Sequence, residues 1–292
     1  MKPLSYLLAL YCLVFISCTS TSPEDINFGA IADCQYCDQV SRGVRKYSTS
    51  HQKLQKCVDH FNTLDLDFVI HLGDLIDKDF KSFDVVLPIY NKLKSPHYHA
   101  LGNHDFDVAD SLKKDVPAKM GMPAKYYQFQ KGQWRFLVLD GNDLSFNAYP
   151  EGSPKYQESE KYYLDNKIKS PKWNGALGAT QIHWLKKQLD EAQANKQNVI
   201  LFAHFPVYPK DPHNLWNSKE IIEILESYPC VKAYINGHNH KGNYGLKNGI
   251  HYLTLKGMVD TDKNTYAIIR LTNKSIEVQA FGREKNRSLP IK

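Results

Sequence analysis

The chain has 292 residues, of which 42% are apolar, 12% aromatic and 23% charged, the composition of a globular protein with one large core. Its formal net charge of +6 could attract anionic substrates, although scattered lysines are also common on soluble surfaces. The sequence has no Lys/Arg-dense stripe with interleaved aromatic residues, so it does not support a nucleic-acid partner.

The first residues resemble a secretion signal. Lys2 precedes an apolar run over residues 4–16, which is too short to span a bilayer comfortably but suits a signal peptide. Ser17-Cys18 at its end resembles a bacterial lipoprotein cleavage site. We therefore expect residues 1–17 to be a signal peptide, Cys18 to be lipidated and residues 18–25 to be a short tether. Acyl chains would anchor the protein in the bacterial cell envelope, periplasmic or at the outer surface; the alternative is simple secretion.

Residues 26–292 are expected to form a single domain, because no linker-like tract divides them. Strands are predicted at residues 26–32, 68–72, 97–101, 199–203 and 231–235. Helices are predicted at residues 47–62, 82–93, 179–194 and 218–227, with Ser82 and Ser218 as caps and a kink at Pro88. A hairpin is predicted at residues 126–140, a long functional or disordered loop at 141–178, and antiparallel strands at 244–281. This order predicts an α/β fold with two packed mixed β-sheets flanked by helices.

Five short polar clusters carry the candidate chemistry. They occupy residues 33–35, 73–77, 102–105, 203–204 and 237–240, and most directly follow a predicted strand, which is where α/β folds place their sites. Their donors are carboxylate, amide and imidazole groups with no required thiolate, which suits Mn, Fe, Zn or Mg ions. Seven such donors exceed the need of one closed site and fit two adjacent ions that share a carboxylate.

The order of these clusters, D-x-Q, GDxxD, GNHD, AH and GHxH, resembles that of the calcineurin-like metallophosphoesterases. Within that superfamily the chain is most similar to the manganese-dependent ADP-ribose/CDP-alcohol diphosphatases. Four features carry this likeness: Gln35 where most relatives have His, and the runs at residues 42–47, 205–210 and 215–217. The resemblance implies a four-layer sandwich, which agrees with the fold predicted from the elements.

The resemblance also implies a ligand set for two divalent ions. It assigns Asp33, Gln35, Asp74 and His240 to the first ion, and Asp74, Asn103, His204 and His238 to the second. Asp74 would bridge the ions, and a bridging water or hydroxide would be the nucleophile for in-line attack. His238 and His240 lie two residues apart, so in an extended segment both would point the same way.

Three further residues have expected roles near the ions. His104 resembles the family's catalytic histidine, which protonates the leaving oxygen or stabilises developing charge. Asp105 is expected to orient it, and Asp77 to hold a metal ligand. The amide oxygen of Gln35 favours Mn²⁺ or Mg²⁺ over Zn²⁺, so Mn²⁺ is the first expectation for the cofactor, with Fe, Zn or Mg as alternatives.

Basic and aromatic residues near the clusters are candidates for substrate contacts. Arg42, Arg45 and Lys46 would contact a second phosphate, or would only form a solvated basic turn. Tyr36, Tyr208 and Trp216 would stack a base, or would pack in the core. In an oxidising envelope either a Cys34–Cys37 or a Cys37–Cys57 disulfide is possible, with unreactive packing of the thiols as the alternative.

Together these features predict a two-metal hydrolase of phosphoanhydride or phosphodiester bonds. Its expected partners are a small phosphoester or diphosphate substrate, such as ADP-ribose or a CDP-alcohol, and a membrane held through Cys18. The first alternative is a broad-specificity phosphodiesterase or phosphomonoesterase. The second is a non-catalytic envelope binding protein, which would need damaged ligands, and the sequence contains none.

Overall fold

The structure is a computed structural model, and it describes residues 25–291. The predicted signal peptide and Cys18 lie outside the described residues, as does the tether except for Asp25. Within the described part of the chain, no helix is both long and apolar enough to cross a membrane.

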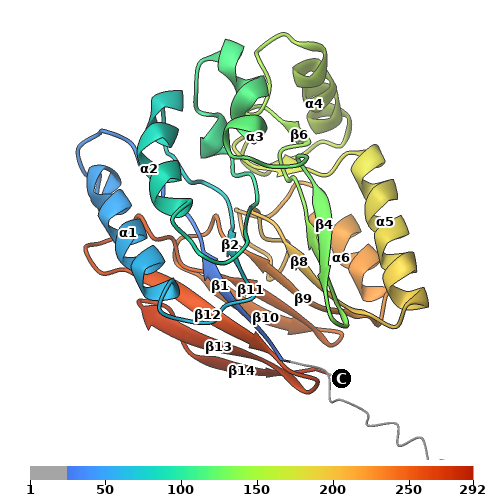
Figure 1. Cartoon of the computed structure of the whole chain (residues 1–292). Coiled ribbons are helices and arrows are strands. Elements are labelled where there is room, and N and C mark those ends of the chain that lie inside the picture. The colour runs from blue at the N-terminus through green and yellow to red at the C-terminus, as the bar shows by residue number, and fades with distance from the viewer. Residues whose placement is uncertain (1–24, 292) are drawn as a thin grey trace, which may run out of the picture.

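Two six-stranded mixed sheets form the centre of the molecule (Figure 1). The first has the order β14 (Arg287–Pro290), β13 (Ser275–Gly282), β12 (Thr265–Leu271), β1 (Ile26–Ile31), β2 (Phe68–His71) and β3 (His97–His99). The second has the order β10 (Asn243–Lys247), β11 (Ile250–Thr254), β9 (Val231–Asn236), β8 (Asn198–Phe202), β5 (Trp134–Val138) and β4 (Tyr127–Lys131). In each sheet the strands that precede the polar clusters run parallel to one another, so their carboxyl ends share one edge.

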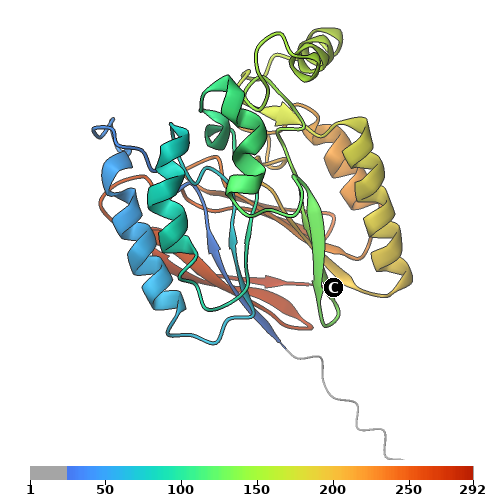
Figure 2. The ribbon, with the colours of Figure 1, turned by 45° about the horizontal axis from the view of Figure 1, so that its top comes forward.

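The helices lie around the two sheets. They are α1 (Ser50–Phe61), α2 (Phe83–Tyr90), α3 (Val116–Lys119), α4 (Pro154–Asp165), α5 (Ala179–Ala194) and α6 (Ser218–Glu226). Short 3₁₀ turns occupy Tyr47–Thr49, Phe80–Ser82, His104–Phe106 and Asp110–Asp115. Figures 1 and 2 show α1 and α2 on one flank and α5 and α6 on the other. The α/β fold with four layers is therefore confirmed.

Apolar side chains hold these layers together. Between the sheets, Phe28 stacks on Phe68 with ring centroids 4.7 Å apart, and the edges of Phe136 and Phe202 close against Phe28 from the other sheet. Separate buried clusters fill the space under α1 and α2 and the space under α5 and α6. Such aromatic pairs contribute about 0.5–1.5 kcal/mol each to stability beyond the effect of their buried area. This packing holds the two sheets, and so the strand ends that carry the site, in fixed positions.

Two local expectations were wrong. Residues 141–178 are not an unstructured loop: they contain α4 and a small two-stranded antiparallel sheet of β6 (Leu144–Ser145) and β7 (Gly175–Ala176). Neither predicted serine caps its helix: the hydroxyl of Ser82 donates to the carbonyl of Lys78 instead, and Ser218 is the first residue of α6, which has Asn217 at its N-cap and no capping side-chain hydrogen bond. Of the alternatives left open for the cysteines, the structure has free thiols and no disulfide among the described residues Cys34, Cys37, Cys57 and Cys230.

Candidate metal centre

The predicted ligands lie on loops at the carboxyl ends of the strands. β1 leads to Asp33, β2 to Asp74, β8 to His204 and β9 to His238. Asp33, Asp74 and His238 have positive φ angles of 53°, 57° and 69°, a region that non-glycine residues occupy only where the surroundings enforce it. The segment around His238 is therefore a turn and not the extended stretch that was expected. This local strain lets each loop reverse direction and point its side chain at a common centre.

Two glycines allow the loops to approach one another. Gly73 has a φ of +90°, and a Cβ there would lie 2.6 Å from Nδ1 of His204. A Cβ at Gly102 would overlap the carboxylate of Asp74. Each motif glycine therefore makes room for a neighbouring ligand.

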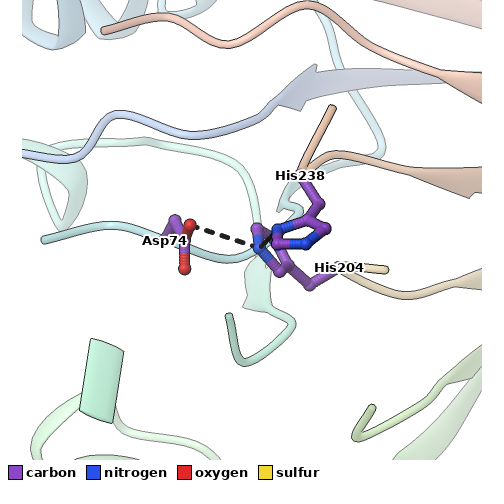
Figure 3. Close-up of side chains that lie close together, drawn as sticks. All are labelled: Asp74, His204 and His238. Atoms are coloured by element: carbon purple, nitrogen blue, oxygen red, sulfur yellow. Dashed lines mark hydrogen bonds and ion pairs between the residues drawn. The ribbon is translucent and has the colours of Figure 1, made fainter. Parts of the chain in front are cut away.

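Figure 3 shows the cluster predicted to hold the second ion, in which the His204 ring lies between Asp74 and His238. Nε2 of His204 is 3.2 Å from Oδ2 of Asp74 and 3.0 Å from Nδ1 of His238. All three side chains are buried, and their ligand atoms are close enough to bind one cation.

The residues predicted for the first ion lie beside this cluster. Nε2 of His240 is 3.4 Å from Oδ1 of Asp33. Gln35 connects the two groups, because its Nε2 donates a hydrogen bond of 2.9 Å to Oδ2 of Asp74. Asn103 lines the same cleft as Gln35, Asp74 and His240. The structure thus brings all seven predicted ligands together, and their roles as ligands remain predictions.

Each of the three histidines has its outer nitrogen engaged by an acceptor. Nδ1 of His204 donates to the carbonyl of Leu72 at 2.8 Å, and Nδ1 of His240 lies 3.0 Å from Oδ1 of Asp260. Nε2 of His238 lies 3.0 Å from Oδ1 of Asn174. Outer partners of this kind fix the tautomer of a metal-binding imidazole and leave its inner lone pair for the ion.

Electrostatics favours positive charge at this centre. Burial lowers the pKa of an imidazole, but the Asp74 carboxylate overcomes this effect and raises the pKa of His204 to about 9. In the same way, Asp33 raises the pKa of His240 to about 9 against the effect of burial. Burial, with the nearby charge of His204, holds the pKa of His238 well below its ordinary value. Without ions, protons on His204 and His240 balance the carboxylates, so binding of divalent cations must displace them.

The remaining donors also fit metal ions. Oε1 of Gln35 and Oδ1 of Asn103 are buried and have no hydrogen-bond partner among the described residues. An unpartnered buried amide oxygen costs about 1–3 kcal/mol, and a bound cation would remove that cost. Carboxylate, amide and imidazole donors together suit Mn²⁺ or a similar ion.

His104 and its carboxylate partner lie at the edge of the centre. Nδ1 of His104 is 3.3 Å from Oδ1 of Asp77, and the His104 side chain is 26% exposed, which leaves Nε2 as the nitrogen for a substrate in the cleft. The expectation that Asp105 orients His104 was wrong, because Asp77 occupies that position. The Asp105 carboxylate instead accepts four backbone N–H bonds, from Asp74, Leu75, Ile76 and Gly102.

A cleft of about 320 Å³ opens above these residues. Of the candidate substrate contacts, only Arg45 lines it among the described residues. Lys46 and Arg42 are not among the residues that line it. Nζ of Lys46 lies 3.7 Å from Oδ1 of Asp262. The backbone of Arg42 forms a bridge with that of Arg45.

The three candidate aromatic residues pack outside the cleft. Tyr36 and Tyr208 pack edge-on against His51 and Tyr252. The indole of Trp216 donates to the carbonyl of Pro171. These contacts agree with the alternative that the three residues pack in the protein and do not stack a base.

Several cleft residues escaped prediction. Trp173 and His213 line the cleft, with ring centroids 5.0 Å apart, and the ring of Trp173 also lies 5.0 Å from that of His238. Asp260 and Asn174, the partners of His240 and His238, were missed too. None of the four belongs to a motif, and the aromatic, Asn- and Gly-rich composition of residues 141–178 was the only signal for two of them.

Comparison with known proteins agrees with this geometry. Residues 26–242 match the model of the calcineurin-like phosphoesterase family. A manganese-dependent ADP-ribose/CDP-alcohol diphosphatase from Oryza sativa is 32% identical, over 82% of this chain and 86% of that protein, and one from Xenopus tropicalis is 30% identical over the same shares. A dimetal phosphatase from Danio rerio has the same fold, with a TM-score of 0.82 and 24% identity over 91% of this chain and 99% of that one. The chain therefore belongs to the calcineurin-like phosphoesterase family and is a metal-dependent hydrolase, as the sequence motifs predicted.

Proposed function

We propose that this protein hydrolyses the phosphoanhydride bond of nucleoside diphosphate-linked compounds, such as ADP-ribose or CDP-alcohols, with two divalent ions of which Mn²⁺ is the first choice. The observation that carries the proposal is the composition of the cleft. It joins the metal-type cluster of Asp74 and His238 to a guanidinium, Arg45, and to an exposed indole, Trp173. The names of the manganese-dependent relatives support the same substrate class.

Each part of the cleft suits one part of such a substrate. Bound divalent ions would neutralise the phosphate that is attacked and lower the pKa of a water nearby. Arg45 would hold the second phosphate through paired hydrogen bonds. Trp173 would stack the base, a contact that contributes about 1–3 kcal/mol in other proteins. His104, held by Asp77, would give a proton to the leaving phosphate oxygen.

A substrate screen tests the proposal. Purified protein is assayed with Mn²⁺ or Mg²⁺ against ADP-ribose, CDP-choline, cyclic nucleotides, mononucleotides and bis-p-nitrophenyl phosphate. The proposal expects the highest kcat/KM for the two diphosphates with Mn²⁺. A higher kcat/KM for simple diesters or monoesters would favour the broad-specificity alternative, and absence of turnover on every substrate would favour the binding protein.

Arg45→Ala and Lys46→Ala form a matched pair for the same screen. Both residues lie on one loop, but only Arg45 lines the cleft. We expect Arg45→Ala to raise KM for ADP-ribose at least tenfold, while Lys46→Ala leaves it near wild type. Equal effects of the two substitutions would mean that the loop acts through general charge and not through a specific contact.

A further inference from the structure

Asn174 is a fully buried residue that uses both ends of its side-chain amide. Its Nδ2 donates a hydrogen bond of 2.7 Å to the carbonyl of Pro212, and its Oδ1 lies 3.0 Å from Nε2 of His238. A carbonyl oxygen can only accept, so the contact with Pro212 fixes which end of the amide is nitrogen. Oδ1 must then accept, and the proton on neutral His238 must sit on Nε2.

This assignment leaves the lone pair of His238 on Nδ1. That atom lies 3.0 Å from Nε2 of His204, whose other nitrogen donates to a backbone carbonyl. Once a cation displaces the Nε2 proton of His204, the inner lone pairs of the two rings converge beside Asp74. If the proton of His238 moved to Nδ1, the cluster would lose one of its three ligand atoms.

We propose that Asn174 is a positioning residue that holds His238 in the tautomer able to bind the second ion; this inference rests on the proposed two-ion function. Trp173 is its neighbour in the chain, and Pro212 precedes His213, so the same amide also ties together the two loops whose side chains wall the cleft. Asn174 thus connects the ion site to the wall that would contact the substrate.

A purely structural role, in which Asn174 only braces the two loops, makes different predictions. Asn214 provides the matched control: it is buried in the same region, and its Nδ2 donates to the carbonyls of Val207 and Pro209, but it makes no hydrogen bond to a histidine of the described chain. Asn174→Ala removes both the brace and the imidazole partner, whereas Asn214→Ala removes a brace alone. Asn174→Asp keeps an acceptor for His238 and removes the donor to Pro212.

The experiment measures Mn²⁺ binding to metal-free protein by isothermal titration calorimetry, without substrate. We expect Asn174→Ala to weaken one of two Mn²⁺ sites by about 10- to 100-fold, the usual effect of losing such a partner. Asn214→Ala and Asn174→Asp should bind both ions within about threefold of wild type. Wild-type affinity in folded Asn174→Ala, or an equal loss in Asn174→Asp, would overturn the proposal.

Histidine side-chain ¹⁵N NMR of the metal-free wild-type protein provides a test that needs no variant to fold. We expect His238 to carry its proton on Nε2, and a proton on Nδ1 would overturn the proposal. Neither measurement uses a substrate. A protein that acts on a different phosphoester would contradict the proposed substrate class while leaving the role of Asn174 intact.

Discussion

The carboxylate of Asp77 lies 3.3 Å from Nδ1 of His104, although 27 positions separate the two residues. This contact turns Nδ1 toward Asp77, while the His104 side chain lines the cleft. Asp77 is itself buried, so packing fixes its side chain, and its carboxylate can in turn hold the His104 ring in one orientation. The pair therefore places a proton donor beside the ion cluster without making His104 a ligand.

We expect His104→Ala to lower kcat by roughly 10²-fold or more, the usual size of a general acid contribution. Asp77→Asn should lower kcat by roughly 10-fold to 100-fold, because a misplaced catalytic group loses much of its effect. Both variants should keep the wild-type Mn²⁺ content, measured by atomic emission. Asp79→Asn, an exposed position two residues further on, is the control and should retain full activity. Loss of an ion in His104→Ala would show that the histidine is a ligand after all.

Asp105→Asn should affect metal binding more than catalysis. Its carboxylate accepts N–H bonds from the loop of Asp74 and from Gly102, and a buried N–H left without an acceptor costs about 1–3 kcal/mol. We therefore expect a lower Tm and weaker Mn²⁺ binding, with kcat largely recovered at saturating Mn²⁺. Unchanged Mn²⁺ affinity together with a large fall in kcat would return Asp105 to the role first expected for it, that of orienting His104.

The sequence predicted which metal-type side chains the fold brings together, and the reason is physical. Most of them follow a short apolar run that is typical of a buried strand, and strands that end at one edge bring their loops together. The partners of those ligands could not be predicted in this way. Asp260 and Asn174 reach His240 and His238 from loops whose positions depend on how the sheets pack.

Neighbours in sequence were misleading for the same reason. Asp105 follows His104 directly, but the two lie in a 3₁₀ turn, where successive side chains point about 120° apart. One therefore faces the cleft while the other faces the loop of Asp74. The distant Asp77 is brought to His104 by the packing of two loops, which no local pattern encodes.

Stability should fall in acid through His71, which is fully buried and has no hydrogen-bond partner for either ring nitrogen among the described residues. Burial, with the nearby charge of His204, lowers the pKa of His71 to about 3. Between the ordinary pKa of 6.5 and that value, the unfolded chain binds a proton that the folded chain does not, so stability decreases as pH falls. The maximum slope is about 1.4 kcal/mol per pH unit.

Urea unfolding at pH 7.5, 6 and 5 measures this effect. His71→Leu should lose less stability across the series than wild type, because it cannot take up the proton in the unfolded state. His183→Leu, at an exposed position on α5, should follow wild type. Parallel curves for wild type and His71→Leu would mean that His71 is protonated in the folded protein.

Lipid anchoring at Cys18 stays a prediction, since that residue lies outside the described part of the chain. Cys18→Ala should abolish membrane attachment and leave a soluble, active domain, because acyl chains added there would be the anchor. Cys12→Ala, within the apolar run of the expected signal peptide, should leave attachment unchanged. Recovery of Cys18→Ala in membranes after a high-salt wash would count against lipidation.

Gln35→His would give the first ion site an imidazole in place of an amide oxygen. Gln35 has a φ of +45°, a conformation that histidine adopts more readily than most residues, so the backbone should tolerate the change. An imidazole is a stronger donor than an amide for borderline ions, so Mn²⁺ should be held more tightly. The same change removes the hydrogen bond from Nε2 of Gln35 to Asp74 and places a wider ring beside the phosphate, so turnover should fall modestly.

The affinity effect is the more dependable of the two, because it follows from the type of donor and needs no placement to within half an ångström. Activity is measured against free Mn²⁺ after chelator treatment of both proteins, and half-maximal activity of Gln35→His should require less Mn²⁺. Gln35→Ala is the control: it removes the donor altogether and should require more Mn²⁺ than wild type. If Gln35→His needs as much Mn²⁺ as wild type, or more, then the unpartnered Oε1 of Gln35 does not contact an ion. The likeness to the manganese-dependent diphosphatases would then lose its main chemical support at this position.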